Sequence, residues 1–129
     1  DAVLIVSSPQ ELAVTIVAKS INMARIMKVP ILGLIENMSY LACPDCGRRI
    51  ELFGRSKGRE ASAAAKTEFL GSVAVNPLIS QLCDEGIIEE YNSADFASIA
   101  QRIIEKTREV KVHQELRQAD SVAERERRR

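Results

Sequence analysis

The sequence predicts an α/β protein in which helices flank a parallel sheet. Three short apolar runs support this class, at residues 2–6, 31–35 and 69–75, and a helical pattern follows each of them. Strand and helix in alternation are typical of parallel sheets with right-handed crossovers. A chain of 129 residues is expected to form one domain at most.

The first predicted strand and helix lie in residues 2–28. Residues 2–6 are an unbroken apolar run, typical of a parallel strand buried on both faces. Residues 7–9 read Ser-Ser-Pro, so we expect hydroxyl caps and a proline near the first helical turn. Residues 10–28 carry apolar side chains at helical spacing, and Pro30 closes that helix.

The following elements alternate in the same way. Residues 31–35 predict a second buried strand, and residues 50–53 alternate like a short strand. An alanine-rich stretch at residues 60–66 predicts a helix, and residues 69–75 predict the third strand of the sheet. Residues 40–53 form an insertion between the second strand and this helix.

Two more helices are predicted toward the C-terminus. Asn76-Pro77 opens a short helix, for which Gly86 is a suitable C-cap, and Ser93 caps a final helix. Residues 1–104 therefore form the α/β part of the chain. Residues 105–129 are dominated by charges, which predicts a charged helical extension or a disordered tail.

Composition disfavours several classes of partner. Basic and acidic residues balance at 18 each, aromatics make up 4%, and Trp is absent, so no nucleic-acid partner is expected. No apolar run approaches the ~18 residues of a membrane span, so no membrane partner is expected. Three cysteines and no signal-peptide pattern indicate the cytoplasm. The chain opens on Asp1 directly before a strand, as a segment of a larger protein would.

Cys43-Pro44-Asp45-Cys46-Gly47 carries the most specific chemistry. Two residues between two thiolates allow both sulfurs to turn toward one metal ion or one cluster edge. Two thiolates are half of a tetrahedral sulfur site, and the chain has no second such pair. We therefore expect a second copy of the chain to complete the site. Spacing leaves zinc and iron–sulfur equally open, and a redox dithiol or incidental thiols remain weaker alternatives.

Other candidate residues lie at the ends of the predicted strands. Polar residues occur at the ends of all three strands, in Ser7-Ser8, Glu36-Asn37 and Val75-Asn76, and ligands of such sheets bind beyond the strands' carboxyl ends. Asn37 could read a base edge or simply form a turn.

The remaining candidates carry weaker expectations. Cys83 is expected to be a packed small residue, and His113, in the charged tail, to face solvent. Residues 53–58 form a basic loop without phosphate-cradle spacing.

The sequence resembles the Mrp/ApbC family, MinD/ParA-like P-loop ATPases that act as iron–sulfur cluster carriers. The resemblance covers residues 1–104 and is most specific where Glu36-Asn37-Met38-Ser39 precedes the cysteine pair. The matching segments are Asp1 through Ser8-Pro9-Gln10-Glu11, Leu34 to Tyr40, Cys43 to Gly47, Leu52-Phe53-Gly54, Phe69 to Val73, Asn76 to Ile79, and Asp84-Glu85-Gly86.

The resemblance implies the C-terminal half of a P-loop NTPase parallel sheet with a Cys-x-x-Cys insertion. It further implies a [4Fe–4S] cluster bridging a homodimer through Cys43 and Cys46 of each subunit, with apo iron–sulfur proteins as acceptors. Positions matching Asn37, Asn76 and Pro77 lie beside the adenine of ATP in this family. ATP and magnesium would bind in the full-length protein, whose Walker A loop lies upstream of Asp1.

Two departures from the family pattern qualify the nucleotide chemistry. Residues 73–76 read Val-Ala-Val-Asn where the family usually has Ile-Pro-Leu-Asp, and residues 55–58 replace a glycine-rich run. We therefore expect no ATPase activity from this chain alone. The function inferred is cluster binding and transfer. The alternatives are a zinc-bridged, non-enzymatic dimer module and a partition-type ATPase fragment, of which the latter gives no reason for the cysteine pair.

Overall fold

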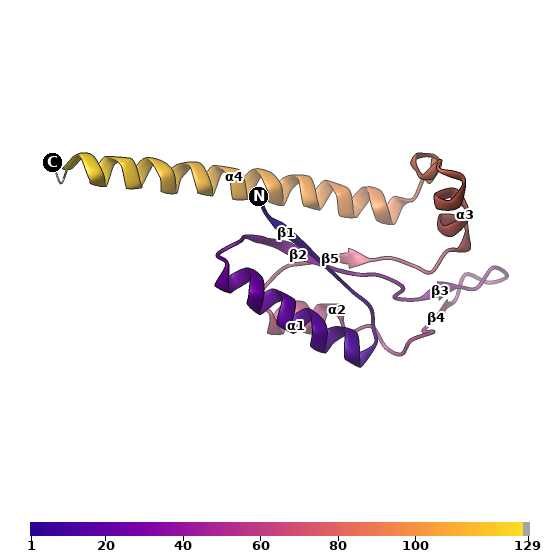
Figure 1. The fold of residues 1–129 in the computed structure, drawn as a ribbon. Helices are drawn as coiled ribbons and strands as arrows, with labels where there is room; N and C mark the ends of the chain where they lie inside the picture. Colours follow the sequence, from indigo (N-terminus) through magenta and orange to yellow (C-terminus); the bar gives the residue numbers. More distant parts are fainter. Residues whose placement is uncertain (128–129) are drawn as a thin grey trace.

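The computed structural model describes residues 1–127 and has three layers. A parallel sheet of three strands lies between two helices on one face and one long helix on the other (Figure 1). In chain order, the elements are β1 (Val3–Ser7), α1 (Glu11–Ile26), β2 (Ile31–Glu36), β3 (Leu41–Ala42), β4 (Arg49–Ile50), α2 (Gly58–Ala64), β5 (Phe69–Ser72), α3 (Pro77–Glu85), the 3-10 helix η1 (Ile88–Glu90) and α4 (Ala94–Arg127).

The strand order is β1-β2-β5, so β2 is the central strand. Ser7 pairs with Glu36, and Glu36 pairs with Ser72, which brings the carboxyl ends of all three strands side by side. The two-stranded sheet of β3 and β4 lies beyond this end, where Leu41 also bridges to Val75 (Figure 1). The predicted ligand edge and the cysteine insertion therefore meet at one end of the sheet.

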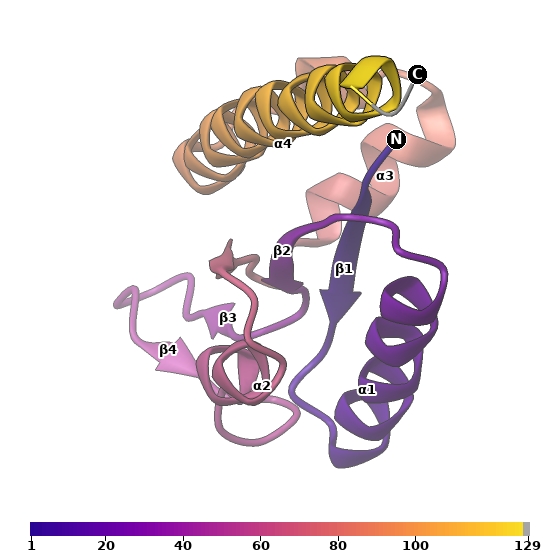
Figure 2. The same ribbon diagram turned by 90° about the vertical axis from the view of Figure 1, so that its left-hand side faces the viewer.

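Each face of the sheet packs its own apolar cluster. Under α1 and α2, the buried core residues are Ile5, Val17, Ile21 and Leu34, as expected from the apolar stripe of α1. Under α4, they are Ile35, Leu70, Val73 and Ile99. Figure 2 shows α1 and α2 together on one side of the strands and α4 on the other.

The expectation that the first strand is buried on both faces is wrong. Val6 in β1 is 54% exposed, because β1 is an edge strand with no further strand beside it within the described sheet. The hydroxyl cap is wrong as well, since α1 begins after Gln10 and has no side-chain cap bond. Ser7 is still paired in β1, and its Oγ donates to the carbonyl of Ser8, so the chain turns before the helix starts.

The predicted bounds of three central elements also shift. The short strand expected at residues 50–53 is β4, which covers Arg49–Ile50. The alanine-rich helix runs from Gly58 to Ala64 instead of 60–66, and Lys66 already has a positive φ of 46°. The third strand ends at Ser72 and not at residue 75. Residues 73–75 instead bond to the end of β2 and to the segment after it: Val73 N donates to Glu36 O, and Val75 N donates to Tyr40 O.

Helix α4 is one continuous helix of 34 residues, about 51 Å long at 1.5 Å per residue. Its N-terminal part packs on the sheet through Ile99 and Ile103. Residues 105–127 continue the same helix, which projects beyond the sheet (Figure 1). Within the described residues, no helix is both long and apolar enough to cross a membrane.

We predict that Gly71 sets how closely α4 approaches β5. A Cβ at this position would lie 2.7 Å from Ile99 Cγ1, so Gly71→Ala forces the helix outward. The expected loss in free energy of unfolding is about 2 kcal/mol, typical of an overpacked core. Urea denaturation of Gly71→Ala, Ile99→Ala and the double variant tests the cause. Gly71→Ala should lower the free energy of unfolding clearly less in the Ile99→Ala background than in the unmodified chain. Strictly additive losses in the double variant would contradict the steric explanation.

Candidate functional site at the carboxyl end of the sheet

A tight turn between β3 and β4 carries the two predicted metal-binding cysteines. The strands pair antiparallel, with Ala42 opposite Arg49. Within the turn, Cys43 N donates to Arg48 O at 2.9 Å, and Gly47 N donates to Cys43 O at 2.8 Å. Gly47 has a φ of 69°, a left-handed conformation that glycine adopts without strain. The cysteines therefore sit at the tip of a closed hairpin, within the insertion that the sequence predicted at residues 40–53.

The sulfur of Cys43 is surrounded by hydrogen-bond donors. The backbone N–H of Cys46 is the largest influence, followed by the backbone N–H of Asp45 and the side chain of Cys46, and together they lower the pKa of the Cys43 thiol. The same interactions place the two cysteine side chains next to each other. Because a thiolate is the form that binds metal, this arrangement prepares Cys43 as a ligand.

Both cysteines are open to a partner. Cys46 is exposed, and Cys43 is half-buried. No group of three or more His, Cys, Asp or Glu side chains that could hold a metal ion occurs among the described residues. In the described part of one chain, the hairpin therefore offers two neighbouring sulfurs as candidate ligands.

Glu36 holds together the two ends of the segment that carries this hairpin. It is 1% exposed, and its Oε1 accepts hydrogen bonds from Lys57 N at 2.8 Å and Gly58 N at 2.7 Å. Ser39 Oγ donates to the other carboxylate oxygen. Ser39 precedes the hairpin and residues 57–58 follow it, so one buried carboxylate closes the base of the whole insertion.

Two neighbouring features complete this closure. Lys57 Nζ forms an ion pair with Glu11 Oε2 at 2.6 Å, which ties the returning loop to the start of α1. A Cβ at Gly58 would clash with the ring of Phe69 and lie 3.0 Å from Glu36 Cβ. Residues 53–58 were predicted only to form a basic loop, so their bonds to Glu36 are an addition from the structure. The available signal was an acidic residue at the end of a buried strand, which requires donors from elsewhere in the fold.

Asn37 lies at the same end of the sheet and has one free polar group. Its backbone N donates to Ser7 O, and its Oδ1 accepts from Met38 N, where the chain turns with a φ of 54°. The amide Nδ2 makes no hydrogen bond within the described residues. Asn37 also lines a cavity of about 310 Å³ with Val6, Ser8 and Met38. The side chain thus serves the turn and still offers a donor to this cavity.

Asn76 and Pro77 are placed differently. Asn76 Oδ1 accepts from Leu78 N at 3.0 Å and caps α3, while its Nδ2 donates to Tyr91 Oη at 3.1 Å. Pro77 is the first residue of α3, and Gly86 ends that helix with a φ of 74°, so the predicted helix start and C-cap are confirmed. The polar atoms of Asn76 are therefore already used inside the protein, unlike the amide nitrogen of Asn37.

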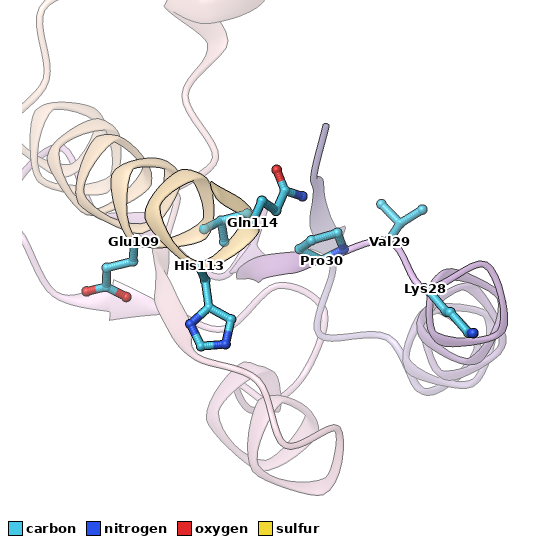
Figure 3. A pocket seen from close by; sticks show the side chains of 7 residues that line it. Lys28, Val29, Pro30, Glu109, His113 and Gln114 are labelled. Atoms are coloured by element: carbon cyan, nitrogen blue, oxygen red, sulfur yellow. The ribbon is translucent and has the colours of Figure 1, made fainter. Parts of the chain in front are cut away.

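The two remaining candidates lie away from the hairpin. Cys83 is exposed on α3, so the expectation of a packed residue is wrong, because this short helix buries only Leu82. His113 is exposed on α4, as expected, and lines a cavity of about 510 Å³ together with Lys28, Val29 and Pro30 (Figure 3). Pro30 precedes β2, so this cavity lies at the amino ends of the strands, opposite to the cysteines.

The fold and the hairpin together define the class: a parallel α/β domain with two neighbouring cysteines at the carboxyl end of its sheet. The family model described as "ParA: NUBPL iron-transfer P-loop NTPase" matches residues 1–108, and the chain belongs to this family.

Curated relatives and a solved structure agree with this assignment. An iron–sulfur cluster carrier protein of Pyrococcus furiosus is 37% identical over 116 residues, which are 86% of this chain and 39% of that protein. The protein of the same name from Methanocaldococcus jannaschii is 38% identical over 110 residues, 82% of this chain and 38% of that protein.

A nucleotide-binding protein from Archaeoglobus fulgidus, solved in complex with ADP, superposes with a TM-score of 0.63. It is 41% identical in sequence, and the match covers 72% of this chain and 38% of that one. The chain thus spans about two-fifths of the length of these relatives.

We predict that Glu36→Ala destabilises the chain by about 3 kcal/mol, because it leaves buried donors at Ser39, Lys57 and Gly58 without their acceptor. Glu36→Gln keeps part of the acceptor set and should lose less. Glu51→Ala removes an exposed acid near the hairpin and serves as the control.

Hydrogen exchange provides the second measurement for Glu36. The amides of residues 57 and 58 should exchange faster in Glu36→Ala than those in β2. Unchanged protection at both amides would show that Glu36 does not close the base of the insertion.

Proposed function

We propose that this chain is the cluster-binding part of an iron–sulfur cluster carrier, in which Cys43 and Cys46 hold the cluster that is passed on. The hairpin carries this proposal, since it presents two adjacent sulfurs, one of them with a lowered pKa, at an accessible tip. Membership of a family described by iron transfer supports iron as the metal, and so do the names of the relatives.

The cluster in this proposal is of the [4Fe–4S] type and bridges two copies of the chain. Such a cluster normally takes four thiolates, and the described residues of one chain offer two of them in one place. A two-fold axis through the cluster would bring the same two cysteines from each subunit together. Loading would then favour the homodimer, because the cluster stabilises only the associated form.

Nucleotide binding belongs to the full-length protein in this proposal. Asn37 has an uncommitted amide donor at the carboxyl end of the sheet, which suits contact with the adenine of ATP. Asn76 and Pro77 would contribute through the backbone around the start of α3, since the Asn76 side chain is engaged. ATP and magnesium would alter the dimer geometry and thereby control cluster loading or release.

The proposed recipients are apo iron–sulfur proteins, and the proposed location is the cytoplasm. A relative from Schizosaccharomyces japonicus, 34% identical over 108 residues, is named a probable cytosolic Fe-S cluster assembly factor, which supports this location.

A zinc-bridged dimer module is the competing function. The same hairpin geometry favours it, since a thiolate supported by backbone N–H groups also suits tetrahedral zinc. The two functions differ in metal content: iron with sulfide belongs to the carrier, and zinc alone to the structural module.

We predict that the cluster depends on both hairpin cysteines. Anaerobic reconstitution with iron and sulfide should give a chain with the broad visible absorbance of an iron–sulfur cluster. Cys43→Ser and Cys46→Ser should each lose most of it, because one thiolate per subunit leaves half of the ligands missing. Cys83→Ser is the matched control, since Cys83 is exposed but lies on α3. Equal iron and sulfide content in all four proteins would refute the assignment.

A further inference from the structure

A polar pocket lies beside the hairpin and along β5. Its volume is about 240 Å³, and its walls come from four parts of the chain: the hairpin, α2, β5 and the N-terminal part of α4. Three arginines line it, namely Arg49 on β4, Arg59 on α2 and Arg102 on α4. These residues are far apart in the sequence, so only the fold brings their charges together.

The three arginines are held in place without carboxylate partners. The Arg49 guanidinium lies 4.1 Å from the centre of the Tyr40 ring, and that of Arg59 lies 5.2 Å from the centre of the Phe69 ring. Arg102 Nη1 donates to the carbonyls of Phe69 and Leu70 at 3.1 and 3.3 Å. None of the three forms an ion pair with another described residue.

These contacts leave most of the N–H donors available. The aromatic contacts of Arg49 and Arg59 use the positive charge and no N–H bond to an acceptor, and Arg102 commits only Nη1 to backbone carbonyls. Asp95 is the acidic residue that lines the pocket, and its Oδ2 accepts a hydrogen bond from Tyr40 Oη at 3.3 Å. The pocket therefore gathers three positive charges against one negative charge, and the hydroxyls of Ser72 and Ser98 add further donors.

We propose that this pocket binds a small multiply charged oxyanion, a phosphate or carboxylate compound, by the guanidinium groups of Arg49, Arg59 and Arg102. Guanidinium forks match both phosphate and carboxylate oxygens in bidentate geometry, and an anion would offset the mutual repulsion of the three cations. The volume suits a compact polyanion and is small for a nucleotide.

Occupancy of the pocket has a structural consequence for the hairpin. Arg49 lies opposite Ala42, which directly precedes Cys43. An anion bound by all three arginines would fix the cysteine hairpin against α2 and α4. The binding itself is independent of any cluster, so it is measured on the cluster-free chain and stands apart from the function proposed above.

Calorimetric titration of the full chain with pyrophosphate, and separately with citrate, tests the proposal at constant ionic strength. We expect saturable binding of one or both probes, and the tighter of the two identifies the phosphate or the carboxylate source. Amide NMR shifts should concentrate at Gly71, Ser72 and Ser98.

Charge-matched variants locate the site. Arg49→Gln should weaken binding about tenfold, the typical effect of losing a charge-assisted hydrogen bond, and Arg49→Lys should fall between this variant and the unmodified chain. Arg55→Gln removes the same charge from an exposed residue outside the pocket and should change affinity less than about twofold. Non-saturable heats for both probes, or equal losses in Arg49→Gln and Arg55→Gln, would overturn the proposal.

Discussion

The buried carboxylate of Glu36 is the interaction on which the site depends. Removing a carboxylate from water costs several kcal/mol unless hydrogen bonds replace its hydration. Here, the replacement comes from the backbone N–H groups of Lys57 and Gly58 and from the hydroxyl of Ser39. The Lys57 side chain pairs with Glu11 instead, so backbone dipoles at the start of α2 supply most of the compensation. The donors come from the segments before and after the hairpin. The Glu36 carboxylate is therefore satisfied only when both ends of the hairpin segment are in place.

This constraint explains how an exposed hairpin of two-residue strands can present a defined pair of sulfurs. β3 and β4 bury little, and their own pairing involves only two residue pairs. The base is fixed by Glu36, and the start of the hairpin continues the sheet through the bridge between Leu41 and Val75. The tip then needs only local order, which the backbone bonds between Cys43 and Arg48 and around Gly47 provide. A fixed base with an open tip suits the proposed role, in which the hairpin would both hold a cluster and release it.

Features that depend on residues close together in the sequence were predictable. Features that depend on contacts between residues far apart in the sequence were not. The cap at Asn76, the left-handed end at Gly86 and the turn at the cysteine pair follow from local preferences. The three strands followed from their apolar runs, although Val6 shows that position in the sheet, and not composition, decides burial. The role of Glu36 and the convergence of Arg49, Arg59 and Arg102 are products of tertiary structure. An acid at the end of a buried strand indicates only that it needs donors, and no periodicity or spacing indicates which donors it meets or that the three arginines converge.

Native mass spectrometry of the chain, reconstituted anaerobically with iron and sulfide, tests the central claim most directly. That claim is that two identical hairpins share one cluster. The account predicts a species of two chains that carries one [4Fe–4S] unit, and a return to single chains without iron when a chelator removes it. A single chain that carries a complete [4Fe–4S] cluster would contradict the account, and so would a dimer that holds zinc and no sulfide.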